Sequence, residues 1–287
     1  MPETDNNATE TPVKRTVLDV EDIIELVPRL KGHEKQVARV LHWLNMDRVN
    51  DVHSRGFDHP GPDFVKFLIE DEFKITLRID NEEVLNNLPE GAFITVSNHP
   101  FGALDGITLI HMIASRRPEY KVMVNMILNK LTAMRPNFIA VDPEASKDPE
   151  KKAVSVRGIK QAIMQVRRGM PIGFFPAGAV SKMNWKWQPN DRKWQPNIIR
   201  LIQQLKVPVI PIYFHGKNSF FFNLLGIISW QLRTMRLPTE VFRKNNSTMH
   251  ISVGEPISVE EQLKHQGSLE EFGAFLRSKT YEMRKNP

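Results

Sequence analysis

A histidine and an aspartate six positions apart are the residues of this chain best suited to chemistry. His99 and Asp105 follow an apolar run that predicts a buried strand over residues 92–97. An imidazole paired with a carboxylate can act as a general base, because the ring takes a proton while the carboxylate fixes its tautomer and stabilises the imidazolium. The nucleophile can then be a hydroxyl or amine of the substrate, with no acylated serine or cysteine, which suggests direct acyl transfer.

The spacing of this pair also fits a structural role. In that alternative His99 caps the next helix or completes a hydrogen bond in the core, and Asp105 is an N-cap residue. Pro100 and Gly102 favour the chemical interpretation, because they predict a tight turn that could fold Asp105 back onto the imidazole.

A second unusual segment contains Phe175, Pro176, Gly178 and Ser181 and also follows an apolar strand. Its backbone amides and the Ser181 hydroxyl could bind an anion or a polar head group, with Lys182 just beyond. The alternative is an ordinary turn from a strand into a loop. Ligands of α/β folds bind beyond the carboxyl ends of strands, so the position of both segments favours one shared site.

The fold class follows from strands and helices that alternate after residue 91. Strands are predicted at residues 92–97, 121–126, 138–141, 171–175, 207–214 and 249–253, and helices at 106–115, 149–168 and 196–205. This alternation predicts an α/β fold, with a mixed, largely parallel central sheet flanked by helices. We expect a disordered tail at residues 1–16, an N-terminal helical cap at 17–90 and the α/β domain at 91–287.

One predicted strand has an unusual composition. Pro208 and Pro211 lie within the apolar run at residues 207–214. Proline cannot donate a hydrogen bond to the ladder, so it is rare in central strands. The edge of a shaped, water-poor pocket would explain the two prolines; an edge strand or a bulge is the alternative.

Composition restricts the classes of function. The chain has 287 residues, of which 41% are hydrophobic and 25% charged, which excludes wholesale disorder. It has no cysteine, which excludes thiol catalysis, disulfides and thiolate metal sites. The net charge of +6 favours anionic partners or serves solubility alone. No motif for a nucleotide, a metal or a serine nucleophile is present, so neither a cofactor nor a metal is expected.

Two segments suit a membrane surface. Trp185, Trp187 and Trp194 lie among lysines and arginines, a mixture typical of the membrane interface and also of single-stranded nucleic-acid binding. We favour the membrane, because no DNA-binding motif is present. The uncharged run at residues 218–232 is too short to span a bilayer, but it could form core or contact a membrane surface.

In order along the chain, these motifs resemble those of the glycerolipid acyltransferase family, which includes bacterial 1-acylglycerol-3-phosphate acyltransferases. The resemblance covers residues 88–257 and rests on Asn98-His99 with Asp105, on Phe175-Pro176-Ala177-Gly178, and on Val207-Pro208-Val209-Ile210-Pro211. Five residues separate the histidine from the aspartate where the family usually has four. The stretch Asn-His-Pro-Phe-Gly-Ala-Leu-Asp-Gly resembles instead the hemolysin-like branch, which includes enzymes of bacterial amino-acid-containing lipids.

The resemblance implies an acyltransferase in which His99 is the general base and Asp105 orients it. The residues implied to shape the turn or hold substrate are Asn98, Pro100, Gly102, Gly106, Phe175, Pro176, Gly178, Ser181 and Lys182. The implied donor is an acyl thioester of acyl carrier protein or coenzyme A, and the acceptor is the hydroxyl of a lysophospholipid or a lyso-aminolipid. The resemblance also implies a peripheral enzyme on the cytoplasmic side of the membrane, without a cofactor.

Two departures from the family pattern keep the acceptor open. Ala177-Gly178-Ala179-Val180 replaces the usual Glu-Gly-Thr-Arg, and the phosphate-contacting arginine has no clear counterpart, although Arg135 and Arg157 are nearby in sequence. These losses favour a lyso-aminolipid over lysophosphatidic acid, and N-acylation of a free amino acid stays open. The extra residue between His99 and Asp105 leaves one alternative, a catalytically inactive lipid-binding or membrane-scaffold protein of the same fold.

Overall fold

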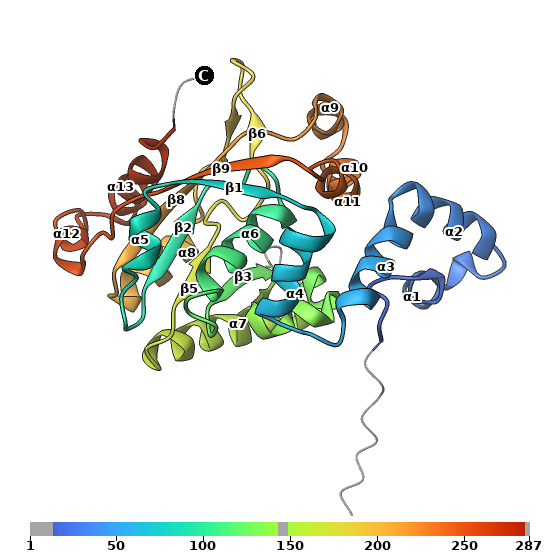
Figure 1. Cartoon of the computed structure of the whole chain (residues 1–287), viewed down its shortest axis with the longest axis horizontal. Helices are drawn as coiled ribbons and strands as arrows, with labels where there is room; N and C mark the ends of the chain where they lie inside the picture. Colours follow the sequence, from blue (N-terminus) through green and yellow to red (C-terminus); the bar gives the residue numbers. More distant parts are fainter. Residues whose placement is uncertain (1–13, 143–148, 285–287) are drawn as a thin grey trace, which may run out of the picture.

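In the computed structural model, residues 14–142 and 149–284 are described, and they are built around a seven-stranded sheet of order β1-β9-β8-β2-β5-β3-β4 (Figure 1). Its strands are β1 (Thr76–Asp80), β2 (Ile94–Ser97), β3 (Lys121–Asn125), β4 (Phe138–Val141), β5 (Ile172–Phe174), β8 (Val209–His215) and β9 (Thr248–Val253). All neighbours pair in parallel except β8 and β9, which are antiparallel. The predicted mixed, largely parallel sheet is therefore confirmed.

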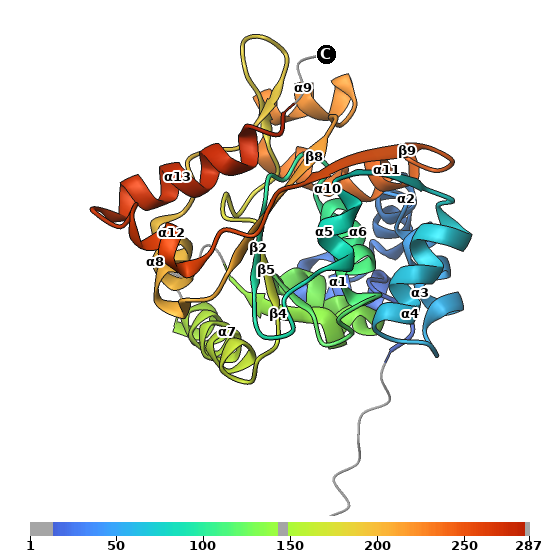
Figure 2. The ribbon, with the colours of Figure 1, turned by 60° about the vertical axis from the view of Figure 1, so that its left-hand side comes forward.

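Helices cover both faces of the sheet (Figure 2). One face carries α7 (Pro149–Arg167), α8 (Pro196–Leu205) and α13 (Leu269–Tyr281), with α12 (Val259–Leu263) beside them. The other face carries α4 (Pro62–Lys66), the π-helical turn η2 (Phe67–Glu72), α6 (Ala103–Ala114) and α11 (Leu237–Phe242). Strands covered on both faces are buried on both sides: all four residues of β2 are buried, and β8 is a nearly continuous apolar run.

The two prolines of the predicted strand do not mark an edge strand: Pro208 lies just before β8 and Pro211 lies within it. β8 lies inside the sheet, between β9 and β2, and Pro211 pairs in register with Val96. The antiparallel ladder with β9 begins only at Ile212, opposite Val253, while the carbonyl of Pro211 accepts a hydrogen bond from Gly254. Pro211 thus occupies the point where the pairing with β9 starts, so its missing N–H costs little there.

The N-terminal segment is only partly the predicted helical cap. α1 (Val20–Leu26), the short turn η1 (Pro28–Leu30), α2 (Glu34–Trp43) and α3 (Met46–Gly56) pack into a small hydrophobic cluster of their own. β1, however, joins the central sheet beside β9, and α5 (Glu82–Asn86) follows it. Most of the predicted tail lies outside the described residues, but Arg15 belongs to the part that is described and pairs with Asp58 beyond α3.

The uncharged stretch at residues 218–232 forms two short helices, α9 (Phe220–Ile228) and the start of α10 (Trp230–Met235). Only Phe222 of α9 is buried, so this stretch is mainly surface rather than core. Within the described ranges, no helix combines the length and the apolar character needed to cross a membrane. The remaining elements are the 3-10 turns η3 (Met126–Lys130) and η4 (Thr132–Asn137), and a hairpin of β6 (Lys182–Met183) and β7 (Pro189–Asn190).

Candidate active site

The segment that carries His99 is fixed at both sides by asparagine side chains. The Asn98 amide donates to the carbonyl of Phe214 at 2.9 Å and accepts from the Phe214 N–H at 2.7 Å, so it ties the end of β2 to β8. The Asn218 amide donates to the carbonyl of Pro100 at 3.1 Å. Asn98 and Pro100, predicted to contact substrate, are therefore buried positioning residues that hold the backbone around His99.

A glycine turn then reverses the chain into α6. Gly102 has a φ of +79°, and a Cβ atom there would lie 2.7 Å from Cδ2 of Leu237, so no other residue fits without rearrangement. Asp105, in the first turn of α6, accepts hydrogen bonds from the N–H groups of Phe101 and Gly102, each at 2.9 Å. The N-cap residue of α6 is therefore Gly102 and not Asp105, which corrects that alternative. Asp105 occupies the third position of the helix, from which its carboxylate still stabilises the helix N-terminus.

The same carboxylate oxygen also faces the catalytic candidate. Nδ1 of His99 lies 3.0 Å from Oδ2 of Asp105, and Asp105 is fully buried while the His99 side chain is 17% exposed. The contact has hydrogen-bond length, but the N–H is not aligned with the oxygen, so a small rotation of the ring is needed for a full bond. The turn brings the two side chains together as Pro100 and Gly102 predict, despite the extra residue between them.

Charges around Asp105 partly offset its burial. Burial raises the pKa of Asp105, against the opposing effects of His99 and of the two N–H donors. Lys244, which belongs to none of the sequence motifs, places its Nζ 4.7 Å from the centroid of the Phe101 ring. Burial lowers the pKa of Lys244, while Glu240 and Asp105 raise it. A lysine is therefore close enough to help keep the buried carboxylate ionised.

The Phe175–Ser181 loop, named here for the segment predicted to bind substrate, lies directly beside His99. The ring of Phe175 packs against the imidazole with centroids 4.2 Å apart, and the Ser181 N–H donates to the carbonyl of His99 at 2.8 Å. Gly178 has a φ of +62° and closes a turn onto the carbonyl of Phe175. Pro176 is buried and its carbonyl accepts from Gln195.

Asp191 organises this loop, and sequence reasoning missed it. Its carboxylate accepts from the Ser181 hydroxyl at 2.5 Å, from the N–H of His99 at 3.2 Å and from the Trp194 indole at 3.3 Å. The Ser181 hydroxyl is thus engaged inside the protein instead of facing a ligand. Trp194 is buried, which corrects its assignment to a membrane contact, whereas Trp185 and Trp187 are exposed as that assignment requires.

Three residues considered in the sequence analysis contribute little at this site: Gly106, and Arg135 and Arg157, the arginines considered as replacements for the family's phosphate-contacting arginine. A Cβ atom on Gly106 would meet only Phe175, at an ordinary 3.9 Å, so the fold does not require glycine there. Arg135 belongs to η4, where its guanidinium donates to the carbonyl of Asn129, and Arg157 belongs to α7 on the opposite face of the sheet.

Two arginines do contact the loop. Arg192 donates to the carbonyls of Ala177 and Gly178 at 2.6 and 3.2 Å, and its side chain is exposed. The buried one is Arg233 of α10, another residue that sequence reasoning missed. Its two terminal nitrogens donate to the carbonyls of Ser181 and Val180 at 3.3 and 3.2 Å. Arg233 is 7% exposed, and burial lowers its pKa. Together with Lys182 it lines a pocket of about 250 Å³ between the β6–β7 hairpin and α9.

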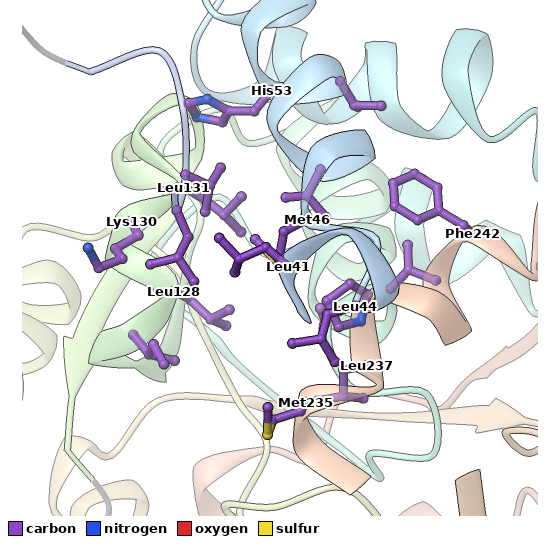
Figure 3. Close-up of a pocket in the computed structure, with 18 of the residues that line it drawn as sticks. Leu41, Leu44, Met46, His53, Leu128, Lys130, Leu131, Met235, Leu237 and Phe242 are labelled. Atoms are coloured by element: carbon purple, nitrogen blue, oxygen red, sulfur yellow. The ribbon is translucent and has the colours of Figure 1, made fainter. Parts of the chain in front are cut away.

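A larger apolar cavity of about 660 Å³ lies between the N-terminal helices and α6 (Figure 3). Leu41 and Met46 face Leu128 and Leu131 across it, and Leu237 closes one end. The cavity reaches the catalytic segment, because Ala103 and Ile107 of α6 line it and Leu237 also abuts Gly102. Its size is in the range of about 300–1,000 Å³ found for small-molecule sites.

One cluster in the described part of the chain has donor atoms close enough for a metal ion. Donor atoms of Asp80, His215 and His250 lie within 4.8 Å of one another, at the β1-β9-β8 end of the sheet. Asp80 already accepts from His250 at 2.7 Å and from Ser252 at 2.8 Å, and His215 bonds to Ser252 at 2.8 Å. The group is a connected hydrogen-bond network.

Comparison with known proteins decides the family. The sequence model of the Acyltransferase family matches residues 24–286. This chain belongs to the Acyltransferase family. It is an acyltransferase, and the resemblance drawn from its motifs is confirmed.

Two curated relatives cover most of this acyltransferase. Lyso-glycine lipid O-acyltransferase from Bacteroides thetaiotaomicron is 26% identical over 224 residues, which are 75% of this chain and 77% of that protein. The protein of the same name from Phocaeicola vulgatus is 25% identical over 230 residues, 77% of this chain and 78% of its own. A crystal structure of the 1-acyl-sn-glycerophosphate acyltransferase PlsC from Thermotoga maritima superimposes with a TM-score of 0.49 at 14% identity, covering 93% of this chain and 95% of that one.

Proposed function

We propose that this enzyme transfers a fatty acyl group from a thioester to the hydroxyl of a lysolipid, with His99 as the general base. The observation that carries the proposal is the 3.0 Å approach of His99 Nδ1 to the buried carboxylate of Asp105. Because Nδ1 faces Asp105, Nε2 is the ring nitrogen left for the substrate. Phe175 packs on the ring and limits its rotation, which favours this orientation.

The reaction follows from this arrangement. Nε2 of His99 removes the proton of the acceptor hydroxyl as its oxygen attacks the thioester carbonyl carbon, and the Asp105 carboxylate stabilises the imidazolium that forms. The tetrahedral intermediate then collapses, the carbon–sulfur bond breaks, and the imidazolium returns the proton to the leaving thiolate. The products are an ester and a free thiol, and the step consumes no metal ion or redox cofactor.

Backbone donors of the Phe175–Ser181 loop are suited to the negative oxygen of the intermediate. In the described hydrogen bonds, the N–H groups of Ala179 and Val180 donate to no protein acceptor, while Gly178 and Ser181 donate within the protein. We therefore assign the oxyanion contact to Ala179 and Val180.

The apolar cavity is suited to the acyl chain. Its lining is almost entirely aliphatic and aromatic, and it ends at α6, the helix that carries Asp105. The donor would be a thioester of acyl carrier protein or coenzyme A, either of which carries negative charge that the net charge of +6 attracts.

We favour a lyso-aminolipid as acceptor, such as an N-acylated amino acid with a 3-hydroxyacyl chain. Two relatives that each align with about three-quarters of this chain are named for a lyso-glycine lipid acceptor. The absence of the family's Glu-Gly-Thr-Arg residues at positions 177–180 points in the same direction. Lysophosphatidic acid is the competing acceptor.

Peripheral binding to the cytoplasmic membrane surface fits the exposed apolar side chains of α9 and the β6–β7 hairpin. Ile227 is 78% exposed, Ile228 69% and Trp185 84%. Patches of this kind are uncommon on proteins without an apolar partner. Trp187 stacks on Phe220, so the hairpin and α9 form one continuous surface.

The test is lipid mass spectrometry on the purified enzyme with an acyl thioester and either lysophosphatidic acid or an N-(3-hydroxyacyl)glycine. We expect a diacylated product with the glycine acceptor and its loss in His99→Ala. His59→Ala is the matched control, because His59 is exposed and remote in sequence from the site. Full activity in a folded His99→Ala variant would contradict the mechanism, and no product from any acceptor would favour a lipid-binding protein without catalysis.

A further inference from the structure

Arg233 is a buried cation without a carboxylate partner. It is 7% exposed, and among the described residues no Asp or Glu lies within ion-pair distance of its guanidinium. Two carbonyls, of Val180 and Ser181, and the ring of Phe222 at 5.5 Å are its recorded partners. A guanidinium stays charged in proteins and has five N–H donors, so three donors remain without a protein acceptor.

The surrounding fold keeps space for this side chain. Gly226 of α9 lies against it, and a Cβ atom there would be 2.6 Å from Cδ of Arg233. A buried charge that meets only neutral carbonyls is costly, which makes such a residue a poor choice for stability alone. An anion that joins the site would offset this cost.

The pocket beside Arg233 has the chemistry of an anion site within an apolar surface. Its volume is about 250 Å³, its lining includes Lys182 and Arg233, and it includes no Asp or Glu. Trp185, Trp187 and Ile227 form its apolar lining and are all at least half exposed. A small charged head group with an attached hydrocarbon chain matches this combination better than a free inorganic ion.

The pocket is linked to the catalytic histidine through one residue. Arg233 holds the carbonyl of Ser181, and the N–H of Ser181 donates to the carbonyl of His99. A head group bound by Arg233 would therefore lie beside the same loop that offers the oxyanion donors.

We propose that Arg233, assisted by Lys182, binds the anionic oxyacid group, a carboxylate or a phosphate, of the acceptor lysolipid. This inference rests on the proposed function and adds the residue that selects a charged acceptor. It assigns the acceptor head group to the side of the Phe175–Ser181 loop that faces α9, whereas the acyl chain occupies the cavity beside α6.

The experiment compares an N-(3-hydroxyacyl)glycine with its methyl ester, which differs only in the missing charge. We expect the wild type to favour the free acid in kcat/KM by about ten- to a hundredfold, the effect of a charge-assisted hydrogen bond. Arg233→Met should remove the preference for the free acid by raising the KM for that acceptor. Arg233→Lys should retain part of the preference. Lys182→Met, at an exposed position, should weaken the preference without removing it. Arg200→Met is the matched control, because Arg200 is exposed on α8, away from the pocket.

A purely structural role for Arg233 would lower the rates with both acceptors equally and leave their ratio unchanged, which would overturn the inference. Equal use of both acceptors by the wild type would overturn it as well, while leaving the proposed acyl transfer intact. If neither of these acceptors is acylated, nor lysophosphatidic acid in the same assay, the proposed function itself fails. Sedimentation with vesicles of phosphatidylcholine and phosphatidylglycerol completes the test. If Arg233→Met loses vesicle binding but keeps the wild-type ratio of kcat/KM between the free acid and the methyl ester, the pocket binds a membrane lipid, and the acceptor role is overturned.

Discussion

The sharpest prediction concerns the two roles of Asp105, which substitutions can separate. Asp105→Asn keeps the shape and an oxygen that accepts from the N–H groups of Phe101 and Gly102, but it removes the charge that faces His99 Nδ1. Loss of carboxylate support from a catalytic imidazole typically costs about 10²–10⁴ in rate. We expect kcat to fall by this amount while the melting temperature stays unchanged or rises, because burial already disfavours the ionised form of Asp105.

Asp105→Ala should behave differently, because it also removes the helix-terminal hydrogen bonds. Two buried N–H groups would lose their acceptor, at about 1–3 kcal/mol each, so the free energy of unfolding should fall by about 2–6 kcal/mol. The comparison of Asn with Ala therefore assigns catalysis to the charge and stability to the hydrogen bonds.

The assay is thioester turnover, followed by release of free thiol, together with thermal unfolding of each variant. His99→Ala combined with Asp105→Asn should be no slower than His99→Ala alone, because residues that act as one unit are not additive. An Asp105→Asn enzyme with activity within a few-fold of wild type would refute the reasoning and leave Asp105 as a helix-capping residue.

Three further predictions concern the cavity, the membrane surface and pH. Val37 lies in the wall of the apolar cavity, so Val37→Phe should shift the preference of the enzyme to shorter acyl chains in a competition between thioesters. Each CH₂ group that loses its contact costs about 0.8 kcal/mol, which lowers kcat/KM for that thioester about fourfold. Ile227→Glu with Ile228→Glu should weaken vesicle binding by about tenfold or more, while the control Leu263→Glu, on α12, should not. Burial lowers the pKa of His53 from its usual 6.5, so at pH values below 6.5 the unfolded state binds a proton more readily than the native state. The free energy of unfolding should therefore decrease as the pH falls from 7 toward about 5.5. The decrease should be smaller in His53→Gln, which cannot take up this proton.

The sequence predicted the architecture well because local pattern and tertiary environment agree in the central sheet. β2, β4, β8 and β9 appear within a few residues of their predicted positions, and the turn after β2 was readable from Pro100 and Gly102. The pattern was less informative where a segment contacts distant parts of the chain. The alternation at Ile75, Leu77 and Ile79 is typical of a strand, but nothing in it indicates that β1 leaves the N-terminal cap to pair with β9, far along the sequence.

Sequence reasoning identified only those parts of the site that lie in contiguous motifs. The His99 and Asp105 pair and the Phe175–Ser181 loop are short contiguous motifs, so their residues carry a signal in the sequence itself. Asp191, Arg233 and Lys244 belong to no recognisable motif. Asp191 is ten residues from Ser181 but 92 from His99, and Arg233 is 52 from Ser181. Lys244 reaches the ring of Phe101 from beyond α11. Ser181 was misread for the same reason, since its partner Asp191 cannot be identified before the chain folds.

The order of strands and helices, the turn that joins a histidine to a carboxylate and the absence of cysteine could all be read from the sequence. Those properties depend on residue type and on contacts between near neighbours. Three features required the folded structure: the full burial of Asp105, the end of the apolar cavity at α6, and a buried arginine, Arg233, against the loop beside His99. Each of these depends on which surfaces meet across the sheet, and packing between distant segments leaves no pattern along the chain.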